Sequence, residues 1–531
     1  MRQSGRYHAD GRPAENRIAG QANISIHYDA ATQSYTVDAL GMVQTFGPSD
    51  IDASQSSNEI DVYLKSTATT SDSLSLTRPG SSGPLTYRYV GGGFWQRVTA
   101  NADSTDFAID SFIYGVQTPI SDVPRTGQAV YPVTLIGGLG DDLPVALSGL
   151  GMLQADFASG EINTSGTMLF VSINGVVLGS TSFTGAGAIG SGTNGFTGTF
   201  AFNESGMFNG TMNGHFYGPG ASEVGAAWYA TQADGRVAAG TLIGRQDATA
   251  AGSNIRLTDL HYDFTQPVSI ADFAYAADTD GIVTGTTPAT SYDRDFSYKA
   301  SDASFTYTDA ASVAHTVHAA DRVAAQSTSS LDVYEIANPD GSRYRLSLFK
   351  PGAANPQLTL TYASFGRWDS IAAGALAADP IRNSAFFAWG IKTDPNLVPR
   401  TGTGHYEGVV AGIAATSGGA AYELGGTSVF DLNFGNLSFG GGLTLSGRDV
   451  KSGVTSGLGT FAFAPGTVGL DGALTADLWD GAASLGNFKG QLYGPGAEEL
   501  GGSFHLRWPA DPANPAGPAT EASGVTVAKR P

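Results

Sequence analysis

Short stretches of alternating apolar and polar residues run along most of the chain, separated by turns rich in Gly, Asn, Asp, Ser and Pro. Phe200-Ala201-Phe202 is one example, with aromatic residues at every second position. Because successive side chains of a strand point to opposite faces of a sheet, this period of two predicts β-strands. We therefore expect an all-β protein.

The chain also matches itself at an offset near 270 residues, which indicates an internal duplication. The longest match pairs residues 214–225 with residues 490–501. Other matches occur in the same order, and they pair residues 29–31 with 309–311, 61–63 with 332–334, 85–87 with 360–362, 123–127 with 398–402, and 198–202 with 459–463. So many colinear matches indicate two copies of one unit.

Each copy changes composition at the sequence Val-Pro-Arg-Thr-Gly, which begins at Val123 and again at Val398. Proline restricts φ and the glycine three residues later permits a wide range of φ, and such residues are typical of turns at a domain boundary. The later part of each copy holds roughly 125 to 135 residues of short alternating strands, which fits a closed eight-stranded barrel filled by its own side chains. The expected domains are a tail (1–22), a first β-rich domain (23–122), a first barrel (123–247), a second β-rich domain (248–397) and a second barrel (398–531).

The segment from Tyr217 to Glu223, Tyr-Gly-Pro-Gly-Ala-Ser-Glu, predicts a tight turn between strands, because glycine permits positive φ. We expect the Glu223 carboxylate to accept amide hydrogens of its own turn. The same pattern recurs at Glu499, which favours a structural role over a catalytic one.

Composition narrows the possible functions. The formal net charge of -20 disfavours nucleic acid and anionic lipid as partners. The absence of cysteine removes disulfides, thiolate metal sites and cysteine nucleophiles. No apolar run is long enough for a spanning helix, and an exported form would carry its targeting segment and any lipidated cysteine before residue 1.

The sequence contains no familiar catalytic motif for zinc hydrolysis, phosphate binding or a serine nucleophile. His315 and His318 are three positions apart, which on a strand places them on opposite faces. The acid pairs Asp141-Asp142 and Glu498-Glu499 are expected to be solvated turn charges, and His215 is replaced by Gln491 in the second copy. We therefore expect a protein that is not an enzyme and that has no resident cofactor or metal.

Two motifs resemble the transferrin-binding protein B family of bacterial surface lipoproteins. One is Pro-x-x-Gly-x-x-x-Tyr, at residues 124–131 and 399–406. The other is Tyr-Gly-Pro-x-Ala-x-Glu-x-Gly with a preceding Phe or Leu, at residues 216–225 and 492–501. The resemblance implies two lobes, each a β-rich "handle" domain followed by an eight-stranded antiparallel barrel.

It further implies display on the outer membrane and capture of a protein, iron or haem source, as a monomer. A TonB-dependent outer-membrane receptor and a surface-lipoprotein export protein are the partners that it suggests. Two alternatives remain open: a secreted haem carrier, with haem as a ligand of Tyr or His, and a structural or adhesive surface protein.

The duplication suggests where a ligand binds, because residues needed by only one lobe should not repeat. The segment 88–97 is richer in aromatic residues and arginine than its counterpart, and such residues dominate protein interfaces. We therefore predict ligand contacts from four of its residues, Arg88, Tyr89, Phe94 and Arg97. Two further regions fail to repeat. One is the apparent insertion at residues 251–300, which alternatively completes the second handle sheet. The other is the longer barrel hairpin between Phe463 and Lys489, where we expect Trp479 on an exposed loop.

Overall fold

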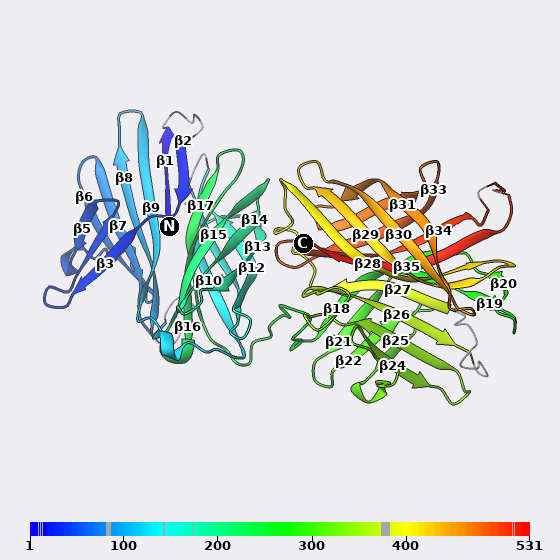
Figure 1. Ribbon diagram of the computed structural model, residues 1–531. Helices are drawn as coiled ribbons and strands as arrows, with labels where there is room; N and C mark the ends of the chain where they lie inside the picture. Colours follow the sequence, from blue (N-terminus) through cyan, green and yellow to red (C-terminus); the bar gives the residue numbers. More distant parts are fainter. Residues whose placement is uncertain are drawn as a thin grey trace. The chain divides into compact units, whose positions relative to one another are not determined.

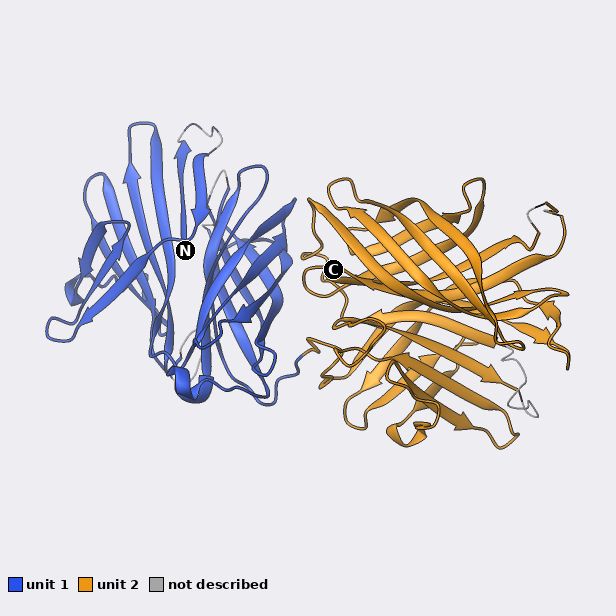
Figure 2. Cartoon of the chain, in the orientation of Figure 1, with its two compact units in different colours: residues 1–252 blue, residues 253–531 orange. Residues whose placement is uncertain are grey.

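The computed structural model describes residues 1–531 apart from residues 9, 11, 13, 81–86, 142–143, 173, 373–382, 512 and 515. The chain forms two compact units, residues 1–252 and 253–531, referred to below as lobe 1 and lobe 2 (Figure 2). In each lobe a β-sheet domain precedes a closed barrel of eight strands (Figure 1). The predicted class, all-β with two handle-and-barrel lobes, is confirmed.

The first handle is a six-stranded antiparallel sheet in the order β2-β1-β9-β8-β7-β6, with a separate three-stranded sheet β3-β4-β5. Short 3-10 turns, η1 (Pro48–Asp50) and η2 (Ile120–Asp122), precede β6 and the barrel. The strands are β1 (Arg2–His8), β2 (Glu15–Gly20), β3 (Ile24–Asp29), β4 (Ser34–Ala39), β5 (Met42–Phe46), β6 (Ile60–Ser66), β7 (Thr70–Thr77), β8 (Val90–Ala100) and β9 (Ser104–Gly115).

The prediction of a tail at residues 1–22 is wrong, because this segment supplies β1 and β2. β1 pairs with β9 over its whole length, from Arg2 opposite Asp110 to His8 opposite Ser104. Its buried positions include Gln3 and Gly5, which are polar or small. The period of two is present, but without apolar side chains it gave no strand signal.

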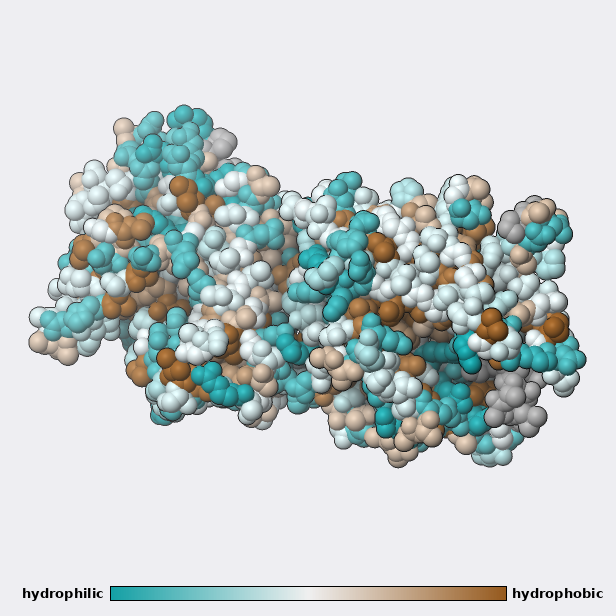
Figure 3. All heavy atoms as spheres, viewed as in Figure 1, coloured by the Kyte–Doolittle hydropathy of each residue, from teal (hydrophilic) through white to brown (hydrophobic). Residues whose placement is uncertain are grey.

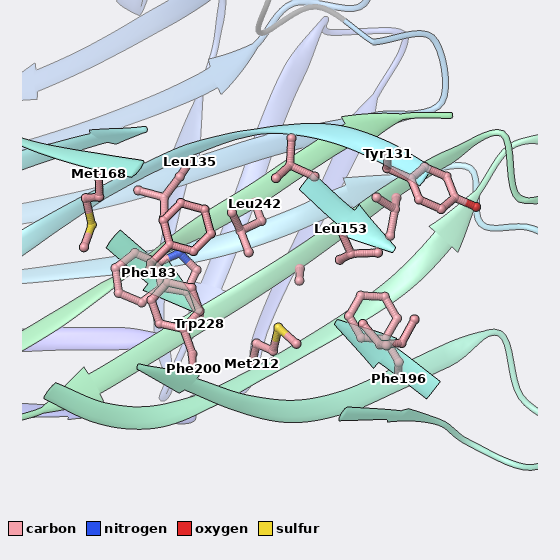
Figure 4. Close-up of a cluster of buried hydrophobic side chains, with 14 of the residues drawn as sticks. Tyr131, Leu135, Leu153, Met168, Phe183, Phe196, Phe200, Met212, Trp228 and Leu242 are labelled. Carbon is pink, nitrogen blue, oxygen red and sulfur yellow. The ribbon is translucent and has the colours of Figure 1, made fainter. Parts of the chain in front are cut away.

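The first barrel closes by pairing β10 with β17. Its strands are β10 (Gln128–Gly140), β11 (Pro144–Asp156), β12 (Glu161–Val171), β13 (Val177–Ile189), β14 (Gly195–Asn203), β15 (Met207–Tyr217), β16 (Glu223–Thr231) and β17 (Val237–Arg245). Inward-facing aromatic and aliphatic side chains fill the interior, with Phe200 stacked on Trp228 at 4.3 Å between ring centroids (Figure 4). This packed interior is the one predicted for a barrel of this size.

The second handle is one eight-stranded sheet in the order β23-β22-β21-β18-β27-β26-β25-β24, with a small β19-β20 hairpin. The 3-10 turn η4 (Ala319–Asp321) precedes β24. The strands are β18 (Phe264–Phe273), β19 (Tyr275–Ala277), β20 (Val283–Thr286), β21 (Thr290–Lys299), β22 (Ser304–Thr308), β23 (Ala314–Val317), β24 (Leu331–Ala337), β25 (Arg343–Phe349), β26 (Ala363–Ile371) and β27 (Asn383–Gly390).

Residues 251–300 are therefore not an insertion, because β18 and β21 complete the second handle sheet. In lobe 1 the counterpart of β18 is β1. The counterpart of the single strand β21 is the pair β2 and β3, which belong to two separate sheets. The match of residues 29–31 with 309–311 is also wrong in register, since it pairs the β3–β4 turn with the β22–β23 turn. Asp29 and Asp309 each accept a backbone N–H of their own turn, so similar turn chemistry produced the match.

The second barrel closes by pairing β28 with β35. Its strands are β28 (Thr403–Thr416), β29 (Ala421–Asn433), β30 (Ser438–Asp449), β31 (Thr455–Val468), β32 (Ala473–Trp479), β33 (Ser484–Tyr493), β34 (Glu499–Pro509) and β35 (Ala519–Lys529). A second apolar core fills it. In both lobes the barrel wall packs against the handle, so sites at this junction belong to one compact unit.

Candidate functional site

The signature glutamate joins the handle to the barrel in each lobe. Glu223 is buried at the start of β16, and its Oε2 accepts the N–H groups of Tyr89 at 2.7 Å and Val90 at 3.0 Å. Its Oε1 accepts the N–H of Arg88 at 3.0 Å. Glu223 is structural, as predicted, but the prediction that it binds its own turn is wrong: the amides come from the handle, more than 130 residues away.

Glu499 repeats the arrangement in lobe 2, where it accepts the N–H groups of Thr361, Tyr362 and Ala363 at 2.7–2.8 Å. Burial raises the pKa of Glu499, and the three N–H groups oppose that shift. The expectation of solvated charges at Glu498-Glu499 therefore fails for Glu499. Glu498 does bind its own turn, through the N–H of Gly496 at 2.8 Å.

These contacts establish which residues of the two handles are equivalent. Tyr89 corresponds to Tyr362, because each donates its N–H to the signature glutamate. A Cβ on Gly218 would lie 2.4 Å from the Tyr89 ring, and one on Gly494 would lie 2.6 Å from the Tyr362 ring. The sequence match of Tyr87 with Tyr362 is thus displaced by two positions, and Tyr89 does have a counterpart.

A tyrosine-walled pocket of about 170 Å³ lies in the first handle beside this junction. The "tyrosine pocket" is lined by side chains from β4, β6, β7 and β9 and from the segment before β8, namely Tyr35, Asp61, Tyr63, Thr77, Tyr87, Arg88, Tyr89 and Tyr114. Tyr35 and Tyr63 meet edge to face at 5.8 Å between centroids. The pocket therefore offers aromatic faces and phenolic hydroxyls close together.

The hydroxyls of the pocket fall into two groups. Tyr114 donates to the Thr77 carbonyl at 2.7 Å, and Tyr87 donates to the Ile243 carbonyl of the barrel at 3.1 Å. The hydroxyls of Tyr35 and Tyr63 make no hydrogen bond to any described residue. Burial raises the pKa of Tyr63 to about 12, so its phenol is neutral and can donate a hydrogen bond at physiological pH.

Of the four predicted ligand contacts, the structure brings two together at this pocket. Arg88 is exposed, and Tyr89 is half-buried below it. Arg97 lies outside the pocket, 3.9 Å above the centroid of the Trp95 ring, and forms an ion pair with the buried Asp110. Phe94 also lies outside, on the face of β8 opposite to Trp95.

Sequence reasoning missed Tyr35, Tyr63 and Tyr114. Tyr63 and Tyr114 lie in segments that repeat, as Tyr334 and Trp389, and repeated residues were expected to serve the fold; Tyr35 lies in no repeated motif. Their equivalents in lobe 2 differ, since Trp389 replaces Tyr114 and Phe305 replaces Tyr35 in the matching strand positions. Replacement of Tyr114 by Trp389 was visible in the sequence repeat, whereas replacement of Tyr35 by Phe305 required the correct register of the handle strands.

The remaining candidates have structural roles or no assigned role. His315 bonds Asp309 at 2.9 Å and packs on Tyr344 and Trp368, whereas His318 follows the strand. Asp142 lies outside the described residues, and Trp479 is exposed at the end of β32. Among the described residues, no group of three His, Cys, Asp or Glu side chains is placed to hold a metal ion.

The surface of the chain gives no single dominant apolar face in the view of Figure 3, where apolar residues occur in small patches among hydrophilic ones. Within the part of the chain that is described, no helix is long and apolar enough to cross a membrane. The fold and the pocket together define a two-lobed handle-and-barrel protein with a tyrosine-rich recess in its first handle.

Solved structures of transferrin-binding protein B are similar to this chain over most of its length. A double mutant of the protein from Haemophilus parasuis Hp5, described as a vaccine antigen, is 15% identical, with 96% of this chain and 94% of that chain covered and a TM-score of 0.31. Intact Ap-TbpB, with N and C lobes, is 14% identical, with 99% and 100% covered and a TM-score of 0.29. Isotype 1 of the protein from serogroup B Neisseria meningitidis is 16% identical, with 84% and 86% covered and a TM-score of 0.25.

No protein-family model and no curated protein matches the sequence. The handle-and-barrel architecture itself rests on the strand pairings of this chain.

Proposed function

We propose that the protein is a non-enzymatic binding protein on the outside of a bacterial cell, which captures a protein partner through its first handle. The observation that carries the proposal is the tyrosine pocket, whose Tyr35 and Tyr63 hydroxyls have no partner among the described residues. Tyrosine and arginine are the residue types that anchor protein interfaces. A recess of about 170 Å³ is below the size of sites for drug-sized ligands, and it suits one anchoring side chain.

The chain segment that contains the sheet β3-β4-β5 supports a protein partner with a basic surface. Between Arg17 and Lys65 the sequence has no lysine or arginine but six acidic residues: Asp29, Asp38, Asp50, Asp52, Glu59 and Asp61. Asp50 and Asp61 form ion pairs with Lys65 and Arg78, so the other four give the segment most of its net negative charge. The β4–β5 turn exposes Leu40, Met42 and Val43, and Leu40 has a φ of +54°. A large apolar residue in this conformation is costly, so its exposure at a turn fits a contact with a partner.

Capture for the uptake of iron or haem is the finer form of the proposal, with a TonB-dependent receptor and a surface-lipoprotein export protein as cellular partners. It is supported by the sequence resemblance described above. Haem itself fits the pocket less well than a protein does, because the recess is small and burial disfavours the phenolate that binds iron. Secretion as a haem carrier and an adhesive role remain the alternatives.

Binding measurements on the full chain test the proposal. Transferrin, lactoferrin and haemoglobin would be titrated against the wild type and against the double variant Tyr35→Phe/Tyr63→Phe, with Tyr334→Phe in lobe 2 as the matched control. We expect about 30-fold weaker binding for the double variant, since each of the two lost hydrogen bonds contributes about 1 kcal/mol, and no change for the control. If the wild type, the double variant and the control variant bind a ligand with equal affinity, the binding site lies outside the tyrosine pocket.

A haem titration separates the alternatives. A Soret shift with no protein binding would favour the haem carrier. Failure of the protein panel and of haem together would reject the iron-capture form of the proposal.

A further inference from the structure

A second cavity, of about 240 Å³, lies inside lobe 2 between the second handle and the second barrel. We call it the lysine cleft. The handle contributes Ser269 on β18, Asp293 on β21 and Lys392 after β27, and the barrel contributes Lys489 and Gln491 on β33. Two of the seven lysines of a chain with a net charge of -20 therefore line one small recess.

Lys392 extends from the segment after β27 to the edge of the cleft, and its side chain remains partly open to solvent. Its Nζ donates to the Pro267 carbonyl at 2.8 Å, which uses one of its three hydrogens. Burial lowers the pKa of Lys392, while the charges of Asp293 and Asp471 oppose that shift. An ammonium whose charge is disfavoured by burial gains stability when an anion binds beside it.

Lys489 lies on the outer wall of the barrel. Phe488 and Leu492 point into the barrel core, so alternation directs Lys489 and Gln491 outwards, to the side of the cleft. Lys489 is half-buried and makes no hydrogen bond or ion pair with a described residue. Its charge is therefore available to a ligand.

Ser269 adds a neutral donor to the same recess. Its hydroxyl oxygen is buried and has no hydrogen-bond partner among the described residues. A buried hydroxyl left unpaired costs about 1–3 kcal/mol, so such groups normally meet water or a ligand. Gln491 is already engaged, since its Nε2 donates to the Asp471 carbonyl at 2.8 Å.

Neither lysine is required by the fold, as lobe 1 shows. Gln117 occupies the place of Lys392, because each makes a single bridge to the equivalent tyrosine, Tyr217 or Tyr493. Asn213 occupies the place of Lys489, one position before the equivalent glycines Gly214 and Gly490. The two positive charges are thus specific to lobe 2.

We propose that the lysine cleft binds a small molecule through a carboxylate or phosphate group. Lys392 and Lys489 hold the oxyanion with charge-assisted hydrogen bonds, and Ser269 donates a third. Asp293 at the same recess accepts a hydroxyl or ammonium of the ligand. The volume lies just below the range of sites for drug-sized ligands, so the ligand is small. This site is independent of the tyrosine pocket in lobe 1.

Isothermal titration calorimetry on the full chain tests this inference, with citrate and inorganic phosphate as probes and sodium chloride to equalise ionic strength. The variants Lys392→Gln and Lys489→Asn install the residue types of lobe 1. Lys299→Gln removes an exposed lysine of the same handle and serves as the charge-matched control. We expect each cleft variant to weaken binding at least 10-fold, and the control to change it less than 2-fold.

The two probes also identify the chemistry. Saturable binding of citrate alone indicates a polycarboxylate ligand, and binding of phosphate alone indicates a phosphate-bearing one. Absence of saturable binding with both probes, or equal affinity in the Lys392→Gln/Lys489→Asn double variant, overturns the inference. If a cleft variant loses its circular dichroism spectrum, Lys489→Arg replaces it: this variant keeps the charge and should bind within about 3-fold of the wild type, and a loss there also counts against the site.

Discussion

The Glu223 carboxylate accepts the backbone N–H of Tyr89 at 2.7 Å, although 134 residues separate the two along the chain. The same carboxylate binds the N–H groups on both sides of Tyr89. A single buried side chain of the barrel thus satisfies three amides of the handle. The glutamate that the repeated signature shares between the two copies is the residue that fixes the domain junction.

Replacing Glu223 with alanine should loosen this junction. Three backbone N–H groups would lose a charged acceptor, and we expect a destabilisation of about 3 kcal/mol, confined to lobe 1. Hydrogen–deuterium exchange of residues 88–90 measures it directly, because local opening exposes those amides.

Glu498→Ala is the control for this substitution, since its carboxylate binds only its own turn. It should leave exchange at residues 361–363 unchanged, whereas Glu499→Ala should accelerate it. Unaltered exchange at residues 88–90 in Glu223→Ala would contradict the proposed clamp.

Gly218 and Gly220 lie in the same turn but require glycine for different reasons: both need a positive φ, and Gly218 also needs space beside the Tyr89 ring. Both have positive φ, +72° and +60°, but a Cβ on Gly218 would also meet the Tyr89 ring at 2.4 Å, whereas a Cβ on Gly220 meets nothing within 4 Å. We expect Gly220→Ala to cost about 1 kcal/mol from backbone strain and Gly218→Ala to cost about 2 kcal/mol more from the clash. Thermal unfolding of the two variants gives the comparison.

A double-variant cycle tests whether the Tyr89 ring causes the additional cost at Gly218. A Cβ on Gly218 would also meet Ser222 Oγ at 2.5 Å, so Tyr89→Ala should relieve part of the additional cost in the Gly218→Ala background and none in the Gly220→Ala background. A double-variant cycle with no coupling between residues 89 and 218 would show that the ring does not set the requirement.

Arg97 should behave as a structural residue. Removal of its guanidinium leaves Asp110, which is fully buried, without its cationic partner, and breaking such a pair typically costs about 3–5 kcal/mol. Arg97→Ala should therefore lower the unfolding temperature of lobe 1 strongly, as followed by scanning calorimetry. Arg88→Ala, at an exposed position, should leave it nearly unchanged.

The contrast extends to ligand binding. A partner captured at the tyrosine pocket should lose affinity for Arg88→Ala measured well below the unfolding temperature. If Arg88→Ala lowers the unfolding temperature and Arg97→Ala does not, then Arg88 is the structural residue and Arg97 is not.

Lys392 should titrate at lower pH than a lysine in an unfolded chain. Burial disfavours its ammonium form, so the folded pKa lies below the ordinary value of 10.5. Between those two pKa values the unfolded chain binds more protons, and Lys392 makes a contribution to stability that rises with pH. Nuclear magnetic resonance of isotopically labelled lysine side chains measures this pKa directly.

One lysine resonance should shift at lower pH than the rest and should disappear in Lys392→Gln. An anion bound in the lysine cleft stabilises the charged form, so saturating citrate or phosphate should move that resonance back towards 10.5. A Lys392 resonance that titrates together with all other lysines would show that its surroundings in the cleft do not lower its pKa.

Parts of the fold that depend on local pattern could be predicted from the sequence. Alternation at Phe200-Ala201-Phe202 correctly gave barrel strands, and the repeated signature correctly gave two copies. β1 was missed because its buried positions, Gln3 and Gly5, are not apolar. Register in the handles was assigned wrongly at Tyr87 and at Asp29, where short matches reflected composition and turn chemistry.

The tyrosine pocket and the lysine cleft could be predicted from the sequence only in part. Arg88 and Tyr89 were selected because they did not seem to repeat, and both do line the tyrosine pocket. Tyr35, Tyr63 and Tyr114 come from three other strands, and no spacing along the chain relates them. Lys392 and Lys489 likewise meet only because the handle packs on the barrel wall.

The sequence by itself determined the strand-forming alternation, the duplication and the two barrels, because each follows from the geometry of a few neighbouring residues. The tertiary structure alone decided which amides Glu223 binds, which tyrosines share a pocket and which lysines share a cleft. The physical reason is the distance along the chain between the residues that interact. Side-chain alternation is set by the local backbone, whereas these contacts join residues that only sheet closure and packing bring together.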